Sequence, residues 1–163
     1  MAVSLTHIAL HVRDLDACIA FYQRYAALAI VHERITHGKR VVWLAEEGKI
    51  AAAGDGPLAS AVPPGLDFIL VLLPGGPGRH QVDSDFSHLG FALDSTEAVD
   101  AVAAKARDNG VLVWEPRQEN YPVGYYCGVK DPDGNFVEFS YGQPLGPGAP
   151  DYRTPAALSQ RKV

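Results

Sequence analysis

The sequence contains little cysteine and no long hydrophobic run. Its two cysteines, Cys18 and Cys127, are too few for a disulfide framework and are typical of a protein of the reducing cytoplasm. No stretch reaches the roughly eighteen consecutive apolar residues of a membrane helix, and the first residues show no export-signal pattern. We therefore expect a cytoplasmic protein that does not span a membrane.

Clustered basic charge is also lacking. The net charge is −5, and no group of Lys and Arg residues forms the basic patch that binding to phosphate backbones requires, so nucleic acid is not an expected partner. What is present is ordinary for a globular chain: 47% hydrophobic and 20% charged residues. The length of 163 residues suits one domain or two small halves that share a core.

The most informative feature is an internal repeat. Residues 7–14 (HIALHVRD) return as residues 88–95 (HLGFALDS), each a short apolar strand that begins with histidine and leads to an aspartate. A helical stripe follows each copy, with Asp14 or Asp16 expected to cap the first helix and Asp94, with Glu97, the second. Three further strands are then predicted in each half, at 30–35, 40–45 and 67–73, and at 111–116, 124–130 and 135–141. Both halves therefore read β-α-β-β-β.

Composition sets the expected boundaries. We predict a first βαβββ module at 1–74, a Gly- and Pro-rich linker at 75–85, and a second βαβββ module at 86–142. Residues 48–64 are expected to form a loop, and residues 143–163 a Pro/Gly-rich C-terminal arm.

Strand alternation predicts a small metal site. Glu138 alternates with the apolar residues Val137 and Phe139, which we expect to pack under a helix, so Glu138 points to the concave side of the sheet. His7 and His88 stand opposite the apolar positions of their own strands, at equivalent places in the repeat. Two histidines and one carboxylate that face one another are a metal-ligand set, which leaves coordination positions open for substrate.

The motifs resemble those of the vicinal oxygen chelate superfamily, which includes glyoxalase I, bleomycin resistance proteins and extradiol dioxygenases. The resemblance covers about residues 4–142, and its most specific part is the segment 130–139 (KDPDGNFVEF). It implies an α+β fold in which two βαβββ modules form a curled mixed β-sheet cup with helices outside. It also implies one divalent metal ion, Fe(II), Mn, Ni or Zn, bound by His7, His88 and Glu138. Family members commonly dimerise, so we expect a homodimer, with modules paired either within one chain or between two.

One position departs from the family pattern. Glyoxalase I and the epimerases have Glu or Gln on the last strand of the first half, whereas alignment places Val71 there. Valine can neither bind a metal nor move a proton, which weighs against isomerisation by two flanking bases. Glu138, Tyr126 and His11 are the candidates for catalytic or hydrogen-bonding roles; either Tyr125 or Tyr126 should face the cup.

Two classes of function follow. The first is a divalent-metal-dependent enzyme that binds a small substrate through adjacent oxygens, either dioxygenase-like or a glyoxalase-like lyase or isomerase. The alternative is a metal-free drug- or metabolite-binding protein of the bleomycin-resistance type. Such proteins typically lack the metal ligands, which this chain retains.

Overall fold

The computed structural model describes residues 3–52, 66–82 and 84–149. These described residues divide into two compact units: unit 1 comprises those up to residue 80 together with 132–134, and unit 2 comprises those of 81–131 and those from 135 onward. No helix among the described residues has both the length and the apolar character needed to cross a membrane.

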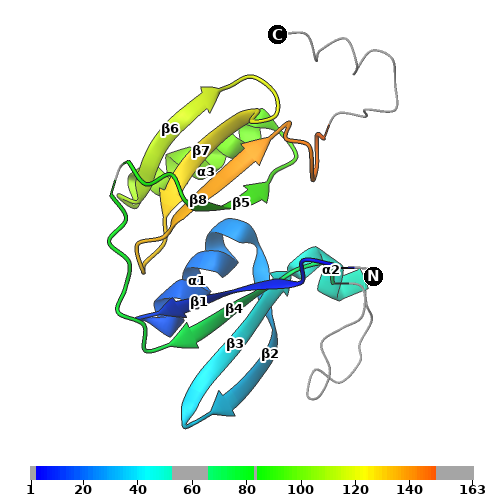
Figure 1. Cartoon of the computed structure of the whole chain (residues 1–163). Coiled ribbons are helices and arrows are strands. Elements are labelled where there is room, and N and C mark those ends of the chain that lie inside the picture. Colours follow the sequence, from blue (N-terminus) through cyan, green and yellow to red (C-terminus); the bar gives the residue numbers. More distant parts are fainter. Residues whose placement is uncertain (1–2, 53–65, 83, 150–163) are drawn as a thin grey trace. The chain divides into compact units, whose positions relative to one another are not determined.

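Unit 1 contains the first copy of the repeat. Its elements are β1 (His7–Val12), α1 (Leu15–Ala26), β2 (Leu28–Thr36), β3 (Lys39–Glu46), α2 (Glu47–Ala52) and β4 (Ile69–Pro74). The four strands form one mixed sheet in the order β1-β4-β3-β2, in which β1 runs parallel to β4 and the other pairs are antiparallel (Figure 1). The helix α1 buries its apolar side, which comprises Cys18, Ile19, Phe21, Tyr22 and Tyr25.

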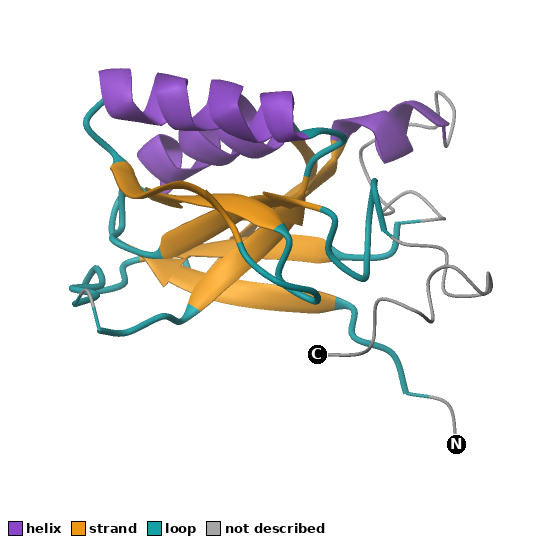
Figure 2. Ribbon diagram, turned by 90° about the horizontal axis from the view of Figure 1, so that it is seen from above, coloured by secondary structure: helices purple, strands orange, loops and turns teal. Residues whose placement is uncertain are grey.

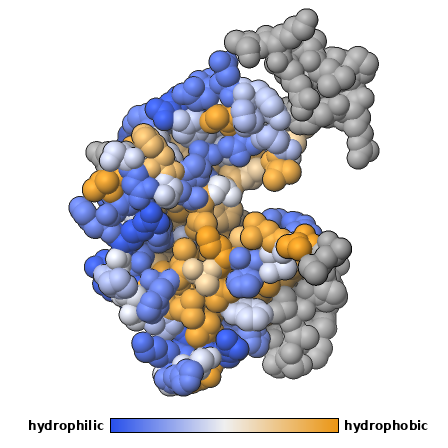
Figure 3. All heavy atoms as spheres, viewed as in Figure 1, coloured by the Kyte–Doolittle hydropathy of each residue, from blue (hydrophilic) through white to orange (hydrophobic). Residues whose placement is uncertain are grey.

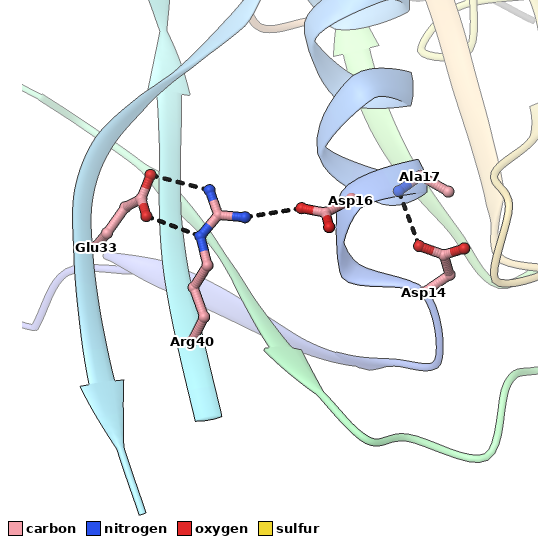
Figure 4. A network of polar contacts seen from close by, with 5 residues as sticks. All are labelled: Asp14, Asp16, Ala17, Glu33 and Arg40. Atoms are coloured by element: carbon pink, nitrogen blue, oxygen red, sulfur yellow. Dashed lines mark hydrogen bonds and ion pairs between the residues drawn. The ribbon is translucent and has the colours of Figure 1, made fainter. Parts of the chain in front are cut away.

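Polar contacts fix the start of α1. The Asp14 carboxylate accepts a hydrogen bond from Ala17 N at 3.0 Å and so satisfies one of the free N–H groups at the helix start, as predicted (Figure 4). Arg40 on β3 pairs with Glu33 on β2 and with Asp16 in the first turn of α1. This surface network connects the helix to two strands of the sheet.

Unit 2 repeats the topology. Its elements are β5 (His88–Ala92), α3 (Thr96–Asp108), β6 (Leu112–Gln118), β7 (Tyr125–Lys130) and β8 (Phe136–Tyr141), and the sheet order is β5-β8-β7-β6. The helix α3 packs along β6, β7 and β8. Figure 2 shows the helices and strands of the chain coloured by type. The α+β class and the βαβββ repeat are therefore confirmed.

Two local predictions were wrong. Residues 48–52, expected in a loop, belong to the short helix α2, where Lys49 and the alanines have high helix propensity; residues 53–64 of that loop lie outside the described residues. The cap of α3 is Ser95 rather than Asp94, because extended Ser95 places its hydroxyl 3.1 Å from Ala98 N. Of the predicted arm, residues 150–163 also lie outside the described part.

The hairpin tip between β7 and β8 has contacts that account for its motif. The Asp133 carboxylate accepts a hydrogen bond from Arg13 N, and the Asp133 carbonyl accepts one from Arg79 N, both at 2.7 Å. Gly134 has a φ of +95°, and a Cβ there would collide with the Arg79 carbonyl. The backbone of Arg13 and Arg79 therefore explains why Asp133 is followed by Gly134.

Candidate metal centre

His88 and Glu138 meet on one face of the sheet of unit 2. Parallel pairing of β5 with β8 places Gly90 opposite Glu138, and His88 lies two residues before Gly90, on the same face. The neighbouring Phe139 faces the other way: it is opposite Cys127, whose thiol contacts the Val99 carbonyl of α3. Both candidate ligands therefore lie on the face away from α3, as predicted.

Local contacts orient the imidazole of His88. Its Nδ1 lies 2.7 Å from the Phe86 carbonyl, which can only accept, so Nδ1 carries the proton and donates it. In the neutral ring, Nε2 then has a free lone pair, which is the arrangement of a metal-binding histidine. The Trp114 ring stands edge-on to the imidazole, with centroids 5.8 Å apart.

Glu138 is buried, with its side chain only 6% exposed. Its Oε1 accepts a hydrogen bond from Gln143 Nε2 at 2.7 Å, and its Oε2 lies 3.5 Å from His88 Nε2. A buried carboxylate is costly unless it is paired or bound to a metal. The burial and the orientation of Oε2 therefore favour a cation beside His88.

The separation of His88 and Glu138 fits a shared metal. With metal–ligand bonds of about 2.1 Å, two ligands on one ion stand about 3.0 Å apart at right angles and about 3.4 Å apart in a tetrahedron. The observed 3.5 Å between Nε2 and Oε2 is close to the second value and long for a direct hydrogen bond. The residues of unit 2 therefore fit two positions of a divalent-metal site.

Two glycines flank Glu138 on the neighbouring strands. Gly128 on β7 leaves room for the Trp114 ring, because a Cβ at Gly128 would collide with Trp114 Cε3. Gly90 on β5 has no atom within 4 Å of the position a Cβ would take. The space beside Glu138 is thus filled on the β7 side and open on the β5 side, where a metal and its ligand could enter.

The two tyrosines of β7 point to opposite faces. Tyr125 donates to Asp100 of α3 at 2.7 Å, and this bond raises the pKa of Tyr125. Tyr126 lies on the face of Glu138, opposite Ser140, and its hydroxyl accepts a hydrogen bond from Arg117 Nε at 2.5 Å. Tyr126 is therefore the tyrosine that shares a face with the candidate ligands.

Cys127 is not a candidate nucleophile. It is fully buried, and burial raises the pKa of its thiol to about 12. The reactive form of cysteine is the thiolate, which is scarce at neutral pH when the pKa is that high. Cys127 therefore serves as a small apolar residue under α3.

Unit 1 has a different residue at the position of Glu138. In β1 and β4 the register places Ala9 opposite Val71, just as Gly90 lies opposite Glu138 in unit 2. Val71 is the repeat equivalent of Glu138 and is 8% exposed. On the side of unit 1 seen in Figure 3, hydrophobic side chains gather around β1 and β4. Unit 1 therefore offers a histidine without a partner carboxylate on β4.

The remaining candidates of unit 1 are exposed histidines. His7 Nδ1 lies 3.0 Å from Thr6 Oγ1, a bond that does not engage Nε2. His11 Nε2 lies 3.3 Å from the Pro74 carbonyl at the end of β4. Among the described residues, no group of three or more His, Cys, Asp or Glu side chains gathers as a metal site. The role of His7 as a third ligand, and that of His11 in catalysis, stay predictions.

Comparison with known proteins identifies the family. The family model described as Glyoxalase/Bleomycin resistance protein/Dioxygenase superfamily matches residues 4–139. The chain belongs to this superfamily. The resemblance inferred from the sequence is thereby confirmed.

The chain is similar in sequence to proteins of two bacteria. An uncharacterized protein of Pseudomonas aeruginosa is 51% identical over 149 residues, which is 91% of this chain and 96% of the relative. The uncharacterized protein YwbC of Bacillus subtilis is 26% identical over 140 residues, or 85% of this chain and 98% of the relative.

Solved structures of the superfamily share the fold. The fosfomycin resistance protein FosX of Listeria monocytogenes, complexed with Mn(II) and 1S,2S-dihydroxypropylphosphonic acid, has a TM-score of 0.61 at 17% identity, covering 86% of this chain and 92% of FosX. A possible glyoxalase of Bacillus cereus has a TM-score of 0.57 at 21% identity, covering 85% of this chain and 99% of the other. At such identities the likeness concerns the fold alone.

Two features of the site around His88 and Glu138 were not predicted from the sequence. Gln143 falls within the predicted arm, and nothing in its neighbourhood indicates that it returns to Glu138. The packing of Trp114 on Gly128 depends on the register of β6 and β7, which is interrupted by irregularities on both sides of Trp114. A cross-strand pairing of this kind leaves no periodic signal in one sequence.

Proposed function

We propose that this chain is a divalent-metal-dependent enzyme that binds a small substrate through two adjacent oxygens. The observation that carries the proposal is the pairing of buried Glu138 with the oriented Nε2 of His88, 3.5 Å apart. We propose His7 as the third ligand. Two histidines and one carboxylate suit Fe(II), Mn, Ni or Zn and leave positions for substrate.

Within this class, we propose dioxygenase-like chemistry ahead of glyoxalase-like isomerisation. Isomerisation moves a proton between two carbons and is served by a base on each side of the substrate. Val71 stands where the repeat would place the second carboxylate, and valine cannot accept a proton. This residue supports a reaction in which one protein carboxylate suffices.

The bound metal would supply a positive charge that stabilises negative charge on the substrate oxygens. The chain's own residues would perform the other tasks. Gln143 and the Phe86 carbonyl hold Glu138 and His88 in orientation. Tyr126 accepts its hydrogen bond from Arg117, so its own proton is available for donation to a substrate oxygen. Trp114 forms an aromatic wall beside His88.

Two assays separate the candidate chemistries. Oxygen uptake with catechols under Fe(II) measures the dioxygenase-like reaction, and loss of the methylglyoxal–glutathione adduct under Ni(II) or Zn(II) measures the glyoxalase-like one. We expect oxygen uptake in the first and a loss of it in His88→Ala. Adduct loss without oxygen uptake would overturn the dioxygenase-like assignment, and bound small molecules without either reaction would support a binding protein.

A matched control is His80→Ala, which removes an exposed histidine of the linker region. We expect this variant to keep the wild-type metal content and activity. Equal losses in His80→Ala and His88→Ala would indicate a general effect of removing histidine rather than a site at β5.

We also propose that the active protein is a homodimer, since members of the superfamily often form dimers. Light scattering coupled to size exclusion should give a mass near twice the 17.5 kDa of the chain. A monomeric mass at micromolar concentration would contradict this assembly.

A further inference from the structure

We propose that Gln143 is a positioning residue for the metal ligand Glu138, so that the segment after β8 is part of the metal centre. This inference rests on the proposed function. Its basis is the hydrogen bond from Gln143 Nε2 to Glu138 Oε1, at 2.7 Å.

Glu138 has little else to hold its carboxylate. Among the described residues, Gln143 is the one hydrogen-bond donor to the Glu138 carboxylate. A buried carboxylate with one donor is oriented by that donor, because hydrogen bonds to carboxylates are directional and strengthened by the charge. With Oε1 engaged by Gln143, Oε2 is the oxygen directed toward His88 Nε2.

The path of the segment places Gln143 where it can do this. Gly142 has a φ of +84°, a conformation that favours glycine, and it turns the chain directly after β8. A few residues later, Gly146, also at a φ of +84°, lies against the Ala92 side chain at the end of β5, with no room for a Cβ. The segment is therefore packed against the two strands that carry His88 and Glu138.

The hydrogen bond from Gln143 to Glu138 should affect metal affinity. Groups that hydrogen bond to a ligand fix its orientation, and their removal typically lowers metal affinity about 10- to 100-fold. An amide donor suits the task, because it binds a carboxylate without adding charge to the site. Gln143 would thus set which carboxylate oxygen faces the metal.

The test is Mn(II) binding to the full-length protein, measured by calorimetry and by electron paramagnetic resonance. Gln143→Met removes the donor but keeps the length and volume of the side chain. The matched control is Gln118→Met, whose exposed amide donates to the Glu119 carbonyl. We expect Gln143→Met to weaken Mn(II) binding about 10- to 100-fold and to change the spectrum of bound Mn(II). Gln118→Met should bind as the wild type does.

The melting temperature of the metal-free protein distinguishes positioning from packing. We expect Gln143→Met and wild type to melt within about 2 °C of each other, since the substitution conserves volume. Two results would overturn the inference while the proposed function stands. One is a Gln143→Met protein that binds Mn(II) as tightly as wild type. The other is a weaker binding that accompanies a drop in the melting temperature of the metal-free protein beyond about 2 °C. Failure of the wild type to bind Mn(II), Fe(II), Ni(II) and Zn(II) alike would overturn both.

Discussion

The two units share one topology and differ at one decisive position. In each, a parallel pair joins the first and last strands of the repeat, and a histidine begins the first strand. The last strand carries Glu138 in unit 2 and Val71 in unit 1, at matching positions of the register. The duplicated scaffold therefore determines where a ligand can be placed, and single substitutions determine whether that place carries chemistry.

The surroundings of the two positions differ in the same sense. Glu138 accepts a hydrogen bond from Gln143. The Trp114 ring fills the space over Gly128 on one side of Glu138, and the space over Gly90 on the other side is open. Val71 lies among apolar residues, opposite Ala9 and Trp43. The surroundings in unit 2 therefore suit a charged side chain at this position, and those in unit 1 suit an apolar one.

The largest expected effect concerns the two histidines of β1. His7→Ala removes a proposed ligand and should weaken Mn(II) binding about 1,000-fold, more than the loss of a group that only supports a ligand. His11→Ala should leave Mn(II) affinity within about twofold and lower kcat by about 100-fold or more if it transfers protons. Calorimetric titration and turnover assays measure the two quantities. Equal Mn(II) affinities of His7→Ala and wild type would remove His7 from the site.

Val71→Glu would make unit 1 resemble unit 2. A carboxylate at this buried position is surrounded by apolar residues, so we expect the unfolding free energy of the metal-free protein to fall by about 3 kcal/mol. Saturating Mn(II) should restore part of that loss if the new carboxylate reaches the metal. Urea denaturation with and without Mn(II) measures both, with Val71→Gln as the neutral control. A metal-independent loss in Val71→Glu would place Val71 away from the metal.

The two glycines beside Glu138 should respond differently to alanine. In Gly128→Ala the new methyl group meets the Trp114 ring, and the repacking should cost about 2 kcal/mol. Gly90→Ala meets no atom within 4 Å and should change the unfolding free energy by less than about 0.5 kcal/mol. Urea denaturation of both variants checks this; similar losses would contradict the open space at Gly90.

The smallest expected effect is at the surface of unit 1. Arg40→Ala removes the ion pairs with Glu33 and Asp16 and should cost about 0.5 kcal/mol at pH 7, since exposed pairs contribute little. The hydrogen bond from Arg40 lowers the pKa of Glu33, so this contribution is present above the usual Glu pKa and is lost as pH falls through the lowered value. Denaturation at pH 7 and at about pH 3 should show the difference between variant and wild type shrinking. A difference that grows in acid would contradict the assignment.

Much of the fold and part of the candidate site could be predicted from the sequence. The repeat of residues 7–14 at 88–95 indicated the duplicated topology, and strand alternation placed His88 and Glu138 on one face because side-chain direction has a period of two. The cap of α3 was misplaced by one residue, because neighbouring Asp94 and Ser95 are both good caps and only the backbone conformation separates them.

Other parts depend on contacts that no local pattern encodes. The return of Gln143 to Glu138 follows from turns at glycines after β8, and the fit of Trp114 over Gly128 follows from an irregular register. The short helix α2 was missed because its glycine and its neighbours suggested a loop. The contacts of Gln143 and Trp114 arise from tertiary packing, which leaves no local signal, whereas α2 follows a helix propensity that its glycine obscured.

Metal content of the purified protein tests the central claim most directly. Wild type and Glu138→Ala should be purified without chelator, loaded with Mn(II), desalted, and measured by elemental analysis alongside circular dichroism. We expect about one Mn(II) per complete site in wild type and nearly none in a folded Glu138→Ala protein. Equal metal content in the two proteins would contradict it.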